Sequence, residues 1–455
     1  MTLLAIEWAS IGTKVLQFIL SFSILVVLHE LGHFLPARWF KCRVEKFYLF
    51  FNPWFSLFKK KIGETEYGLG WIPFGGYVKI SGMIDESMDK EQMNQPPQPW
   101  EFRSKPAWQR LIIMLGGVTV NVLLAFAIFI MIAWVWGDRY VPIANLKYGV
   151  YADSLGRRMG MQDGDNIIAV AGKPIIRQGT AGSEIIMNEA KTVTVLRNGK
   201  HVELNVPEGI ISQLSKNRLR GMAIVRYPLV VDSLLPSVKI QEGTIQKGDT
   251  LINIGGYPIQ YVSDLFKDSV LEHVKVKKTI EVTFRRGQDT VHAVVAQTEK
   301  NGNGIIYKAM EDILGEEHRS YTLVQAIPAG IRKTGETLTN YIRNLKLLFT
   351  SKEVKVQDNL GSVISIASVF PSVWDWQSFW QLTGIFSILL AFMNVLPIPA
   401  LDGGHALFTL VEIISGRKPS DKFIEYAQMV GMVLLFGLMI YALGLDIFHV
   451  VRPVN

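Results

Sequence analysis

Four long apolar stretches constrain the fold of this 455-residue chain more than any other feature. A helix needs about 20 mostly apolar residues to cross a hydrocarbon core of about 30 Å. The segments that reach this length are Val15–Ala37, Leu111–Gly137, Ser378–Leu396 and Tyr426–Leu445. Because a bilayer core offers no partners for backbone polar groups, each segment must form a complete helix. The sequence therefore predicts a polytopic α-helical membrane protein with four transmembrane helices.

The overall composition agrees with this class. Only 19% of the residues are charged, whereas soluble domains average about a quarter. The net charge of +7 comes without a basic run interleaved with aromatics, so we expect no nucleic-acid partner. Cys42 is the single cysteine, so no intrachain disulfide can form. The first stretch follows Glu7 and lacks a basic leader, which favours a retained span over a signal peptide.

Lysines and arginines cluster at particular ends of these stretches. The clusters are Arg38, Lys41, Arg43 and Lys46; Arg103, Lys105 and Arg110; and Arg417, Lys418 and Lys422. The positive-inside rule then predicts that residues 38–110 and 397–423 are cytoplasmic. Both termini and residues 138–375 are expected on the outer side.

The first stretch contains a metal-binding pattern, His29-Glu30-Leu31-Gly32-His33. On a helix, two histidines four residues apart project from one face, so both can bind one zinc ion. Glu30 lies beside them and can take a proton from water. At about 1.5 Å per residue, His29 lies roughly 13 Å along the helix from Arg38. We therefore expect the site within the membrane, nearer its cytoplasmic face.

The end of the third stretch offers a further ligand, Asp402. Pro397 and Pro399 cannot continue a helix, so the chain is expected to unwind before Asp402. Asp402 can serve as the N-cap of the helix that follows. However, a catalytic zinc ion held by two histidines needs a third protein ligand and leaves its fourth position to water. With the His-Glu-x-x-His pattern in the same chain, we prefer the ligand hypothesis, although Asp402 can do both.

Residues from about 64 to 82 alternate aromatic and β-branched side chains with glycines, which predicts a β-hairpin. The segment is too apolar for a free surface hairpin and too short to span a bilayer. A re-entrant hairpin is the preferred interpretation, with an extended substrate as the partner of its open edge. The alternative is a cytoplasmic hairpin packed against the membrane face.

Residues 138–300 contain an internal repeat. The segment from Gly164 to Ile175 matches the segment from Gly248 to Ile259, and an alternating hairpin follows each. The pattern is similar to the central strands of a PDZ domain. We predict two PDZ-like α+β domains, 138–225 and 226–300, which either bind a peptide or protein or act as a spacer or steric gate.

The remaining segments complete the predicted organisation. Residues 1–137 hold the first two spans and the hairpin. Residues 301–375 form a connector, in which apolar residues at helical spacing from Thr322 to Phe349 predict a pair of amphipathic helices on the outer membrane face. Residues 376–455 hold the last two spans.

Taken together, these motifs resemble the site-2 protease family of intramembrane zinc metalloproteases, and within it the bacterial RseP-like group. The motifs are the His-Glu-Leu-Gly-His in a first span, the Gly-Gly-Tyr-Val-Lys at Gly75–Lys79, the tandem PDZ-like copies, and the Asn-x-x-Pro-x-Pro-x-x-Asp-Gly-Gly-His from Asn394 to His405. They occur in the expected order over nearly the whole chain.

The resemblance implies a role for each site residue. His29, His33 and Asp402 would bind one Zn²⁺ ion, and Glu30 would be the catalytic base. Asn394 would contact the substrate backbone, and the hairpin would clamp the substrate as an extended strand. Substrate contacts would come from Gly75, Gly76, Tyr77, Pro397 and Pro399.

The same resemblance implies a biological setting. The protein would lie in the bacterial inner membrane and act in a stress response. It would cleave single-span membrane proteins, such as anti-sigma factors already trimmed on the outer side, and remnant signal peptides. The PDZ-like pair would exclude untrimmed substrates by size.

The chain departs from the family pattern in three places. Phe50-Phe51-Asn52 replaces Gly-x-Gly, Gly116-Gly117 replaces Gly-Pro, and Gly361-Ser362-Val363 replaces Gly-Pro-Ile. We expect these changes to bear on local loop shape and substrate choice rather than on the metal site.

Two other classes of function compete with a protease. A catalytically silent PDZ-bearing scaffold would not need His29, Glu30, His33 and Asp402 intact. A metal or proton transporter also uses intramembrane histidine and aspartate, but the chain shows no inverted repeat of spans.

Overall fold

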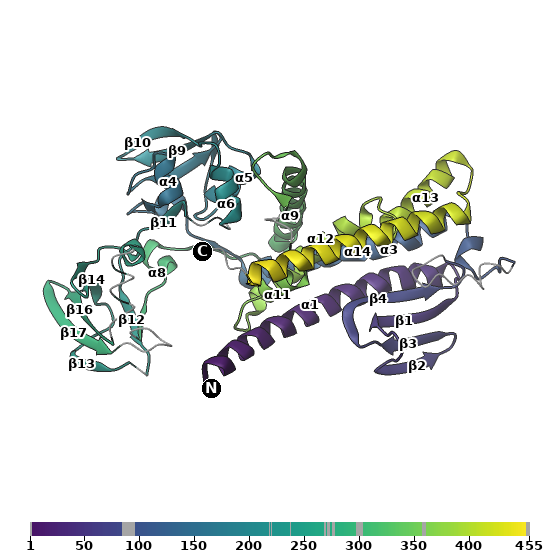
Figure 1. Ribbon diagram of the computed structural model, residues 1–455, viewed down its shortest axis with the longest axis horizontal. Helices are drawn as coiled ribbons and strands as arrows, with labels where there is room; N and C mark the ends of the chain where they lie inside the picture. Colours follow the sequence, from purple (N-terminus) through teal and green to yellow (C-terminus); the bar gives the residue numbers. More distant parts are fainter. Residues whose placement is uncertain are drawn as a thin grey trace. The chain divides into compact units, whose positions relative to one another are not determined.

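Figure 1 shows the computed structural model, which describes residues 2–83, 96–217, 221–236, 238–267, 278–296, 304–356 and 361–451, with Leu219, Val270 and Val274. The chain divides into two compact units. The first, here the membrane unit, comprises Met1–Gly137, Ser320–Arg343 and Leu360–Asn455. The second, here the β-rich unit, comprises Asp138–Arg319 and Asn344–Asn359.

Among the described residues, four helices are long and apolar enough to cross a membrane, which confirms the predicted spans. They are α1 (Thr2–Trp39), α3 (Ala107–Trp136), α12 (Trp376–Val395) and α14 (Asp421–Val451). Helices α1 and α14 begin before the predicted starts at Val15 and Tyr426. The residues before these predicted starts include the charged Glu7 and Lys14 in α1 and Asp421, Lys422 and Glu425 in α14, so hydropathy alone places the starts too late.

Small residues let these helices approach one another. A side chain on Gly32 of α1 would lie 2.7 Å from the carbonyl carbon of Gly116 on α3, so only glycine fits there. Membrane helices commonly pack through such small residues. Buried hydroxyls add contacts: Ser21 of α1 pairs with Thr383 of α12 at 2.9 Å, and Ser387 donates to the Asn121 carbonyl at 2.7 Å. The core of the unit therefore forms where α1, α3 and α12 meet.

A four-stranded sheet packs beside α1 (Figure 1). Its strands are β1 (Val44–Phe51), β2 (Phe58–Ile62), β3 (Thr65–Leu69) and β4 (Ile72–Ile80), in the order β2-β3-β1-β4. The Phe34 ring of α1 contacts Phe47 of β1 with ring centroids 5.5 Å apart. Strand β1 runs parallel to β3 and antiparallel to β4.

This sheet corrects the predicted hairpin. The two predicted strands exist as β3 and β4, but they do not pair with each other, because β1 lies between them. The connection at Gly70 and Trp71 passes across the end of β1, where these residues donate to Leu49 and Phe51 carbonyls at 2.8 and 3.1 Å. The sequence pattern shows strand character but not that a preceding strand completes the ladder. Whether the sheet re-enters the bilayer stays a prediction.

The chain leaves helical geometry after α12, as the two prolines predict. Ala400 adopts a positive φ of 79°, and α13 (Asp402–Ser415) begins immediately afterwards. A side chain on Gly404 would lie 2.6 Å from the Ile398 carbonyl oxygen, so α13 starts tightly against this turn. The turn thereby presents Asp402 at the first position of α13.

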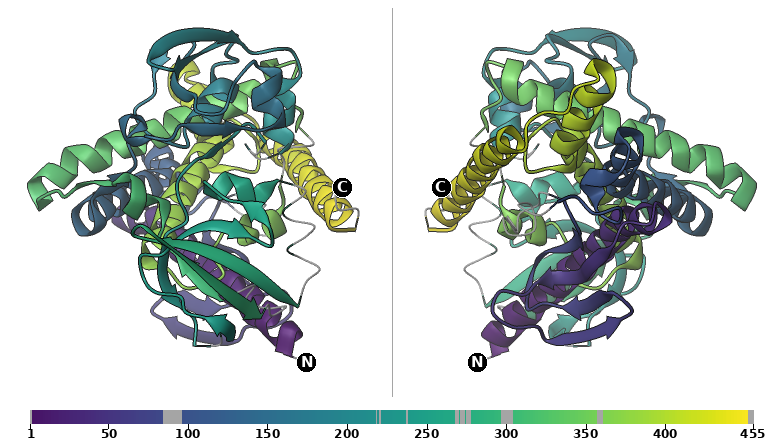
Figure 2. Two further views of the ribbon diagram at one scale, coloured as in Figure 1. Left: turned by 90° about the vertical axis from the view of Figure 1, so that its left-hand side faces the viewer. Right: turned by 90° about the vertical axis from the view of Figure 1, so that its right-hand side faces the viewer.

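The predicted pair of amphipathic helices is wrong. Residues 323–350 form one continuous helix, α9 (Leu323–Thr350), which is uninterrupted in Figure 2. Pro328 lies in its second turn and cannot donate to the Val324 carbonyl, so the helix continues there without one backbone hydrogen bond. Its Tyr341 ring contacts Phe392 of α12 with centroids 5.2 Å apart. A short helix, α11 (Val363–Ser368), follows before α12.

The β-rich unit contains the two repeated segments. The first comprises β6 (Val150–Ala152), α4 (Ser154–Arg158), β7 (Asn166–Val170), β8 (Lys173–Pro174), α5 (Ala181–Met187), β9 (Thr192–Arg197), β10 (Lys200–Asn205), α6 (Ile210–Lys216) and β11 (Ala223–Val225). The second comprises β12 (Val231–Leu234), β13 (Ile240–Gly243), β14 (Thr250–Ile254), β15 (Tyr257–Pro258), the 3₁₀-helix η3 (Val262–Phe266), β16 (Thr279–Arg286), β17 (Asp289–Ala296) and β18 (Ile305–Tyr307). Their sheets have the orders β10-β9-β7-β8 and β13-β17-β16-β14-β15.

Shorter elements complete the described structure. They are the 3₁₀-helices η1 (Phe102–Ser104) and η2 (Ile143–Asn145), strands β5 (Asp138–Tyr140) and β19 (Glu317–Arg319), and helix α8 (Met310–Leu314). Strands β5 and β19 pair where the chain enters and leaves residues 138–319. The predicted domain end at residue 300 lies outside the described residues, and the PDZ assignment stays a prediction.

Each of the two copies contains a buried aspartate that pairs with an arginine at the equivalent position. Asp165 and Asp249 are each 1% exposed, and each accepts two hydrogen bonds from one arginine. Arg197 Nε and Nη2 lie 2.8 Å from the Asp165 oxygens, and Arg286 makes the same contacts with Asp249 at 2.8 and 2.7 Å. The Arg286 guanidinium lowers the pKa of Asp249 below the usual aspartate range. The repeat in sequence is thus a repeat in hydrogen bonding.

We expect Arg286→Leu to lower the free energy of unfolding of the second copy by about 2 kcal/mol, because it leaves a buried carboxylate without its partner. Arg285→Leu, at the exposed neighbouring position, should have little effect. Urea pulse proteolysis of the full chain in detergent measures both. Because the folded-state pKa of Asp249 is depressed, the pair stabilises fully above the unfolded pKa. This contribution is lost as the pH falls through the folded pKa. At pH 7 it is fully present, so equal free energies of unfolding for the Arg286 and Arg285 variants would contradict a stabilising Asp249–Arg286 pair.

Candidate metal centre and active site

Helix α1 presents His29 and His33 from one face, as their spacing predicts. Both side chains are buried, with 8% and 7% exposure. Their Nε2 atoms lie 3.3 Å apart, and the rings meet edge to face. The helix is continuous through both residues, so the pair is held by backbone geometry rather than by a loop.

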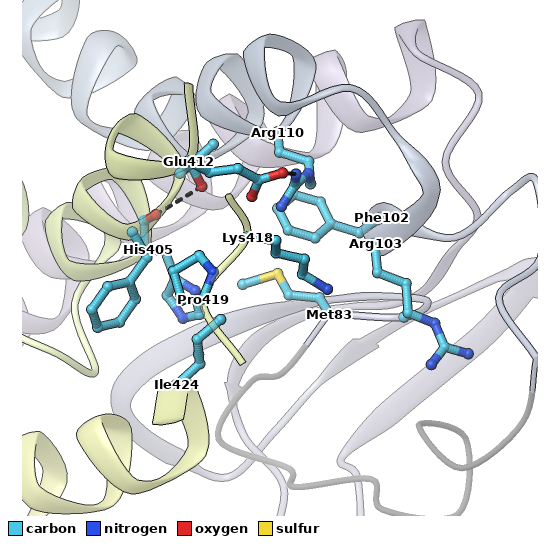
Figure 3. Close-up of a pocket in the computed structure, with 12 residues that line it drawn as sticks. Met83, Phe102, Arg103, Arg110, His405, Glu412, Lys418, Pro419 and Ile424 are labelled. Atoms are coloured by element: carbon cyan, nitrogen blue, oxygen red, sulfur yellow. Dashed lines mark hydrogen bonds and ion pairs between the residues drawn. The ribbon is translucent and has the colours of Figure 1, made fainter. Parts of the chain in front are cut away.

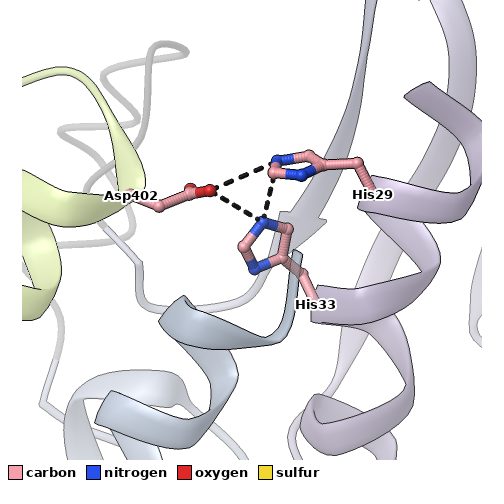
Figure 4. Close-up of side chains that lie close together, drawn as sticks. All are labelled: His29, His33 and Asp402. Atoms are coloured by element: carbon pink, nitrogen blue, oxygen red, sulfur yellow. Dashed lines mark hydrogen bonds and ion pairs between the residues drawn. The ribbon is translucent and has the colours of Figure 1, made fainter. Parts of the chain in front are cut away.

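Asp402 meets this pair from the start of α13 (Figure 4). Its Oδ2 atom lies 3.2 Å from His29 Nε2 and 3.3 Å from His33 Nε2. One ligand atom from each of the three residues lies within 4.8 Å of the others. The carboxylate therefore faces the histidines, while Leu401 occupies the N-cap position of α13.

The chemistry of these three atoms suits a cation. The Ile113 carbonyl oxygen lies 2.8 Å from His33 Nδ1 and can only accept, so Nδ1 carries the proton and Nε2 presents a lone pair. Asp402 Oδ2 is buried and has no hydrogen-bond partner among the described residues. A buried acceptor in that state is costly unless a cation or donor satisfies it. Two imidazole nitrogens and one carboxylate oxygen match a catalytic zinc site with one open position.

Two residues of α3, which the sequence analysis did not single out as site residues, shape the pair. A side chain on Gly117 would lie 2.5 Å from His29 Cε1 and 2.7 Å from its Nδ1, so a larger residue would displace the ring. Asn121 is fully buried, and its side-chain amide lies 3.1 Å from His29 Nδ1. With its oxygen toward Nδ1–H, this amide would fix the tautomer that leaves Nε2 free for a metal. The one sequence signal was the departure at Gly116-Gly117, and the expectation that it leaves the metal residues unaffected is wrong, because Gly117 packs against the His29 ring.

A cavity of about 390 Å³ opens beside the three ligands. Of the predicted site residues, His29, Glu30, His33, Gly76, Tyr77 and Asp402 line it. Asn394 lies outside the lining, but its amide nitrogen is 3.2 Å from His29 Nε2. Gly75, Pro397 and Pro399 are likewise not among its described lining residues. A side chain on Gly75 would strike the Phe51 ring, and Pro399 packs its carbonyl against Gly431.

Strand β4 forms one wall of this cavity, from Gly76 to Ile80. Tyr77 stacks on Tyr48 with ring centroids 5.4 Å apart and donates to Asn52 Oδ1 at 2.9 Å. Burial raises the pKa of Tyr77 to about 12, so the hydroxyl stays protonated and remains a donor at neutral pH. Asn52, part of the Phe50–Asn52 departure, therefore anchors the wall.

Helix α3 also fixes α13, which carries Asp402 (Figure 3). Arg110 Nη2 lies 2.5 Å from Glu412 Oε1, and both side chains are largely buried. Arg110 is three residues before Ile113, so one turn of α3 contacts both His33 and α13. His405 lies one turn after Asp402, and its Nε2 atom is 2.5 Å from Gln428 Nε2 of α14. These contacts fix the position of α13, and so of Asp402, relative to the histidines of α1.

Comparison of the sequence with known proteins relates this chain to metalloproteases. Peptidase family M50 matches residues 17–438 of the chain. A protein of Treponema pallidum (strain Nichols), named as a candidate zinc metalloprotease, is 26% identical over 96% of this chain and 100% of its own length. Relatives with the same designation from Vibrio cholerae and Thermotoga maritima are 27% and 24% identical, with 95% of this chain covered by each. The alignments cover 97% and 98% of those relatives.

Removal of the carboxylate should weaken metal binding. We expect Asp402→Ala to lower bound zinc from about one ion per chain to a small fraction, because two imidazoles alone bind it weakly. Asp375→Ala, which alters the exposed N-cap of α12, serves as the matched control. Elemental analysis of the purified full chain gives the stoichiometry. Unchanged zinc in the Asp402 variant would refute the assignment of this residue as a ligand.

The second prediction at this site concerns Gly117. We expect Gly117→Ala to reduce zinc affinity by at least 10-fold, because the added methyl occupies the position of the imidazoles. Gly437→Ala on α14, where a side chain meets open space, should leave affinity unchanged. Competition with a chromogenic chelator measures both variants. Equal affinities would show that α3 can move away from α1 without disturbing the histidines.

Proposed function

The chain belongs to peptidase family M50, and from this premise we propose that it cleaves single-span membrane proteins at a zinc site within the bilayer. That it is a zinc metalloprotease with membrane-spanning helices follows from the family and its relatives. The convergence of His29, His33 and Asp402 is the observation that carries the proposal. His29 and His33 lie on an apolar helix, so hydrolysis would take place where membrane substrates lie.

Glu30 is the proposed general base. Bound zinc would lower the pKa of water toward about 7 and polarise the scissile carbonyl. Glu30 follows His29 on α1 and lines the same cavity, so its carboxylate can reach a water molecule beside the ligands. It would accept the proton of the attacking water and return it to the nitrogen of the leaving amine. His29, His33 and Asp402 would hold the ion during this step.

Strand β4 is the proposed substrate-binding edge. It is the last strand of the sheet, and the described strands pair with it only through β1. A substrate helix must unwind before its amide can reach the catalytic residues. A strand added to β4 would replace the lost helical hydrogen bonds. Gly76 and Tyr77 would contact this strand directly, and Asn394 would contact its backbone near His29.

The remaining substrate-contact hypotheses concern Gly75, Pro397 and Pro399. None of them lines the cavity directly. Gly75 lies under the Phe51 ring at the start of β4, so it would shape the strand that receives the substrate. The prolines would act by ending α12 and directing the chain toward Asp402.

The biological setting is also part of the proposal. The basic clusters support an inner-membrane orientation in which residues 38–110 and 397–423 are cytoplasmic. The repeated fold of the β-rich unit would then lie outside. We propose that this PDZ-like pair filters substrates by size, so that only trimmed proteins, of the anti-sigma-factor type, or remnant signal peptides enter. The family assignment favours this enzyme over a silent scaffold or a transporter.

We expect Glu30→Gln to reduce cleavage of a single-span substrate in detergent by at least 100-fold, because general-base catalysis contributes about that much or more. Bound zinc should stay near one ion per chain, since Glu30 is not a ligand. Glu336→Gln, on the exposed face of α9, is the matched control. A chelator should abolish wild-type cleavage, and added zinc should restore it. Full-rate cleavage by the Glu30 variant would refute the base assignment, whereas cleavage resistant to chelation would refute the zinc mechanism.

A further inference from the structure

The outer edge of the four-stranded sheet carries three consecutive lysines. Lys59, Lys60 and Lys61 lie in β2, the edge strand opposite β4, and all three are exposed. Glu66 stands opposite Lys61 in the register, but its carboxylate accepts the Tyr48 hydroxyl at 2.7 Å. No ion pair joins these lysines to any described carboxylate. The strand thus presents three positive charges without a counter-charge among the residues that the structure describes.

The strand begins beside an exposed aromatic cluster, here called the tip and consisting of Trp54, Phe55 and Trp71. Trp54 is 91% exposed. The Trp71 ring stacks on Trp54 and on Phe55, with centroids 6.2 and 5.7 Å away, and its indole N–H donates to the Pro53 carbonyl. Three stacked aromatic rings exposed to water would be unfavourable. Such clusters are typical of protein surfaces that meet the membrane interface.

Contacts between the sheet and α1 define the direction of the strands. Near one end, Val44 and Ile80 pack with Ala37 in the last turns of α1. Farther along β4, Gly76 lies against Val26 and Glu30, about two to four helical turns before α1 ends at Trp39. The tip follows β1 beyond this level. Strand β2 returns from the tip and covers roughly 13 Å from Phe58 to Ile62, at about 3.3 Å per residue. The lysines of β2 therefore lie between the level of the tip and the level of Ala37, near the end of α1.

We propose that Lys59, Lys60 and Lys61 bind the phosphate groups of anionic phospholipids while the tip inserts into the same leaflet. Long lysine side chains can reach the headgroup layer from a strand that slants into the bilayer. Clustered lysines beside a membrane span are attracted to anionic lipid surfaces. This contact would set the height of the sheet, and so of β4, relative to His29 and Glu30. The lysines would do more than discourage pairing with another β-edge, the usual role of lysine on edge strands.

The test uses the full chain carrying Leu57→Cys, labelled with the fluorophore NBD and placed in lipid nanodiscs. Leu57 is exposed beside the tip, whereas Cys42 is buried and should stay unlabelled. Spin-labelled phosphatidylglycerol should quench NBD at least twofold more strongly than spin-labelled phosphatidylcholine. The combined variant Lys59→Gln, Lys60→Gln and Lys61→Gln should remove this preference, as should 0.5 M NaCl.

Matched variants separate charge from folding. The triple Arg variant at the same positions should keep the preference for phosphatidylglycerol. Gln at Lys173, Lys200 and Lys216, three exposed lysines of the β-rich unit, should also keep it. Bound zinc confirms that each variant is folded. Equal quenching by both lipids in the wild-type chain would overturn the proposal. The proposal would also be overturned if the combined Gln variant at Lys59, Lys60 and Lys61 kept the preference for phosphatidylglycerol but self-associated. The role of the lysines would then be to block pairing of β2 with another strand.

Discussion

The close approach of α1 and α3 is the contact on which the rest of the site depends. Gly32 and Gly116 bring the two backbones together where side chains would hold them apart. This approach lets the Ile113 carbonyl reach His33 Nδ1 and places the Asn121 amide against His29. Within a bilayer the hydrophobic effect does not drive helices together, so small residues and buried polar contacts do this instead. The histidine pair is oriented by the partner helix and not by α1 alone.

Helical spacing predicted the histidine half of the site, and zinc chemistry together with a family motif predicted the half that carries Asp402. Helical spacing places His29 and His33 on one face without further information. Asp402 is 369 residues beyond His33, and it was identified by zinc's need for a third ligand, by the two prolines before it and by the family motif that contains it. Gly117 was noted only as a departure from a family pattern. The meaning of a glycine depends on which side chains the neighbouring helix places against it, and the sequence does not show that.

The β structure shows the same limit. The Gly-Asp repeats predicted two copies of one fold, and Asp165 and Asp249 indeed occupy equivalent buried positions. Their partners Arg197 and Arg286 become apparent only from the register of the strands. The hairpin prediction failed for a related reason. Strand β1 inserts between β3 and β4 through one parallel and one antiparallel ladder, and a parallel pairing between separated segments leaves no turn signal.

Helix α3 contacts both His33 and α13, the helix that carries Asp402, and this couples metal binding to helix packing. Within one turn, it holds Glu412 of α13 through Arg110 and His33 through Ile113. Three acceptor atoms are thereby forced together in a buried place, an arrangement that is unfavourable until a cation is present. The energy that assembles the ligands must come from helix packing elsewhere in the membrane unit. Zinc binding would then offset part of the energetic cost of bringing the ligands together. Binding the metal should therefore stabilise the packed helices as well as supply the chemistry.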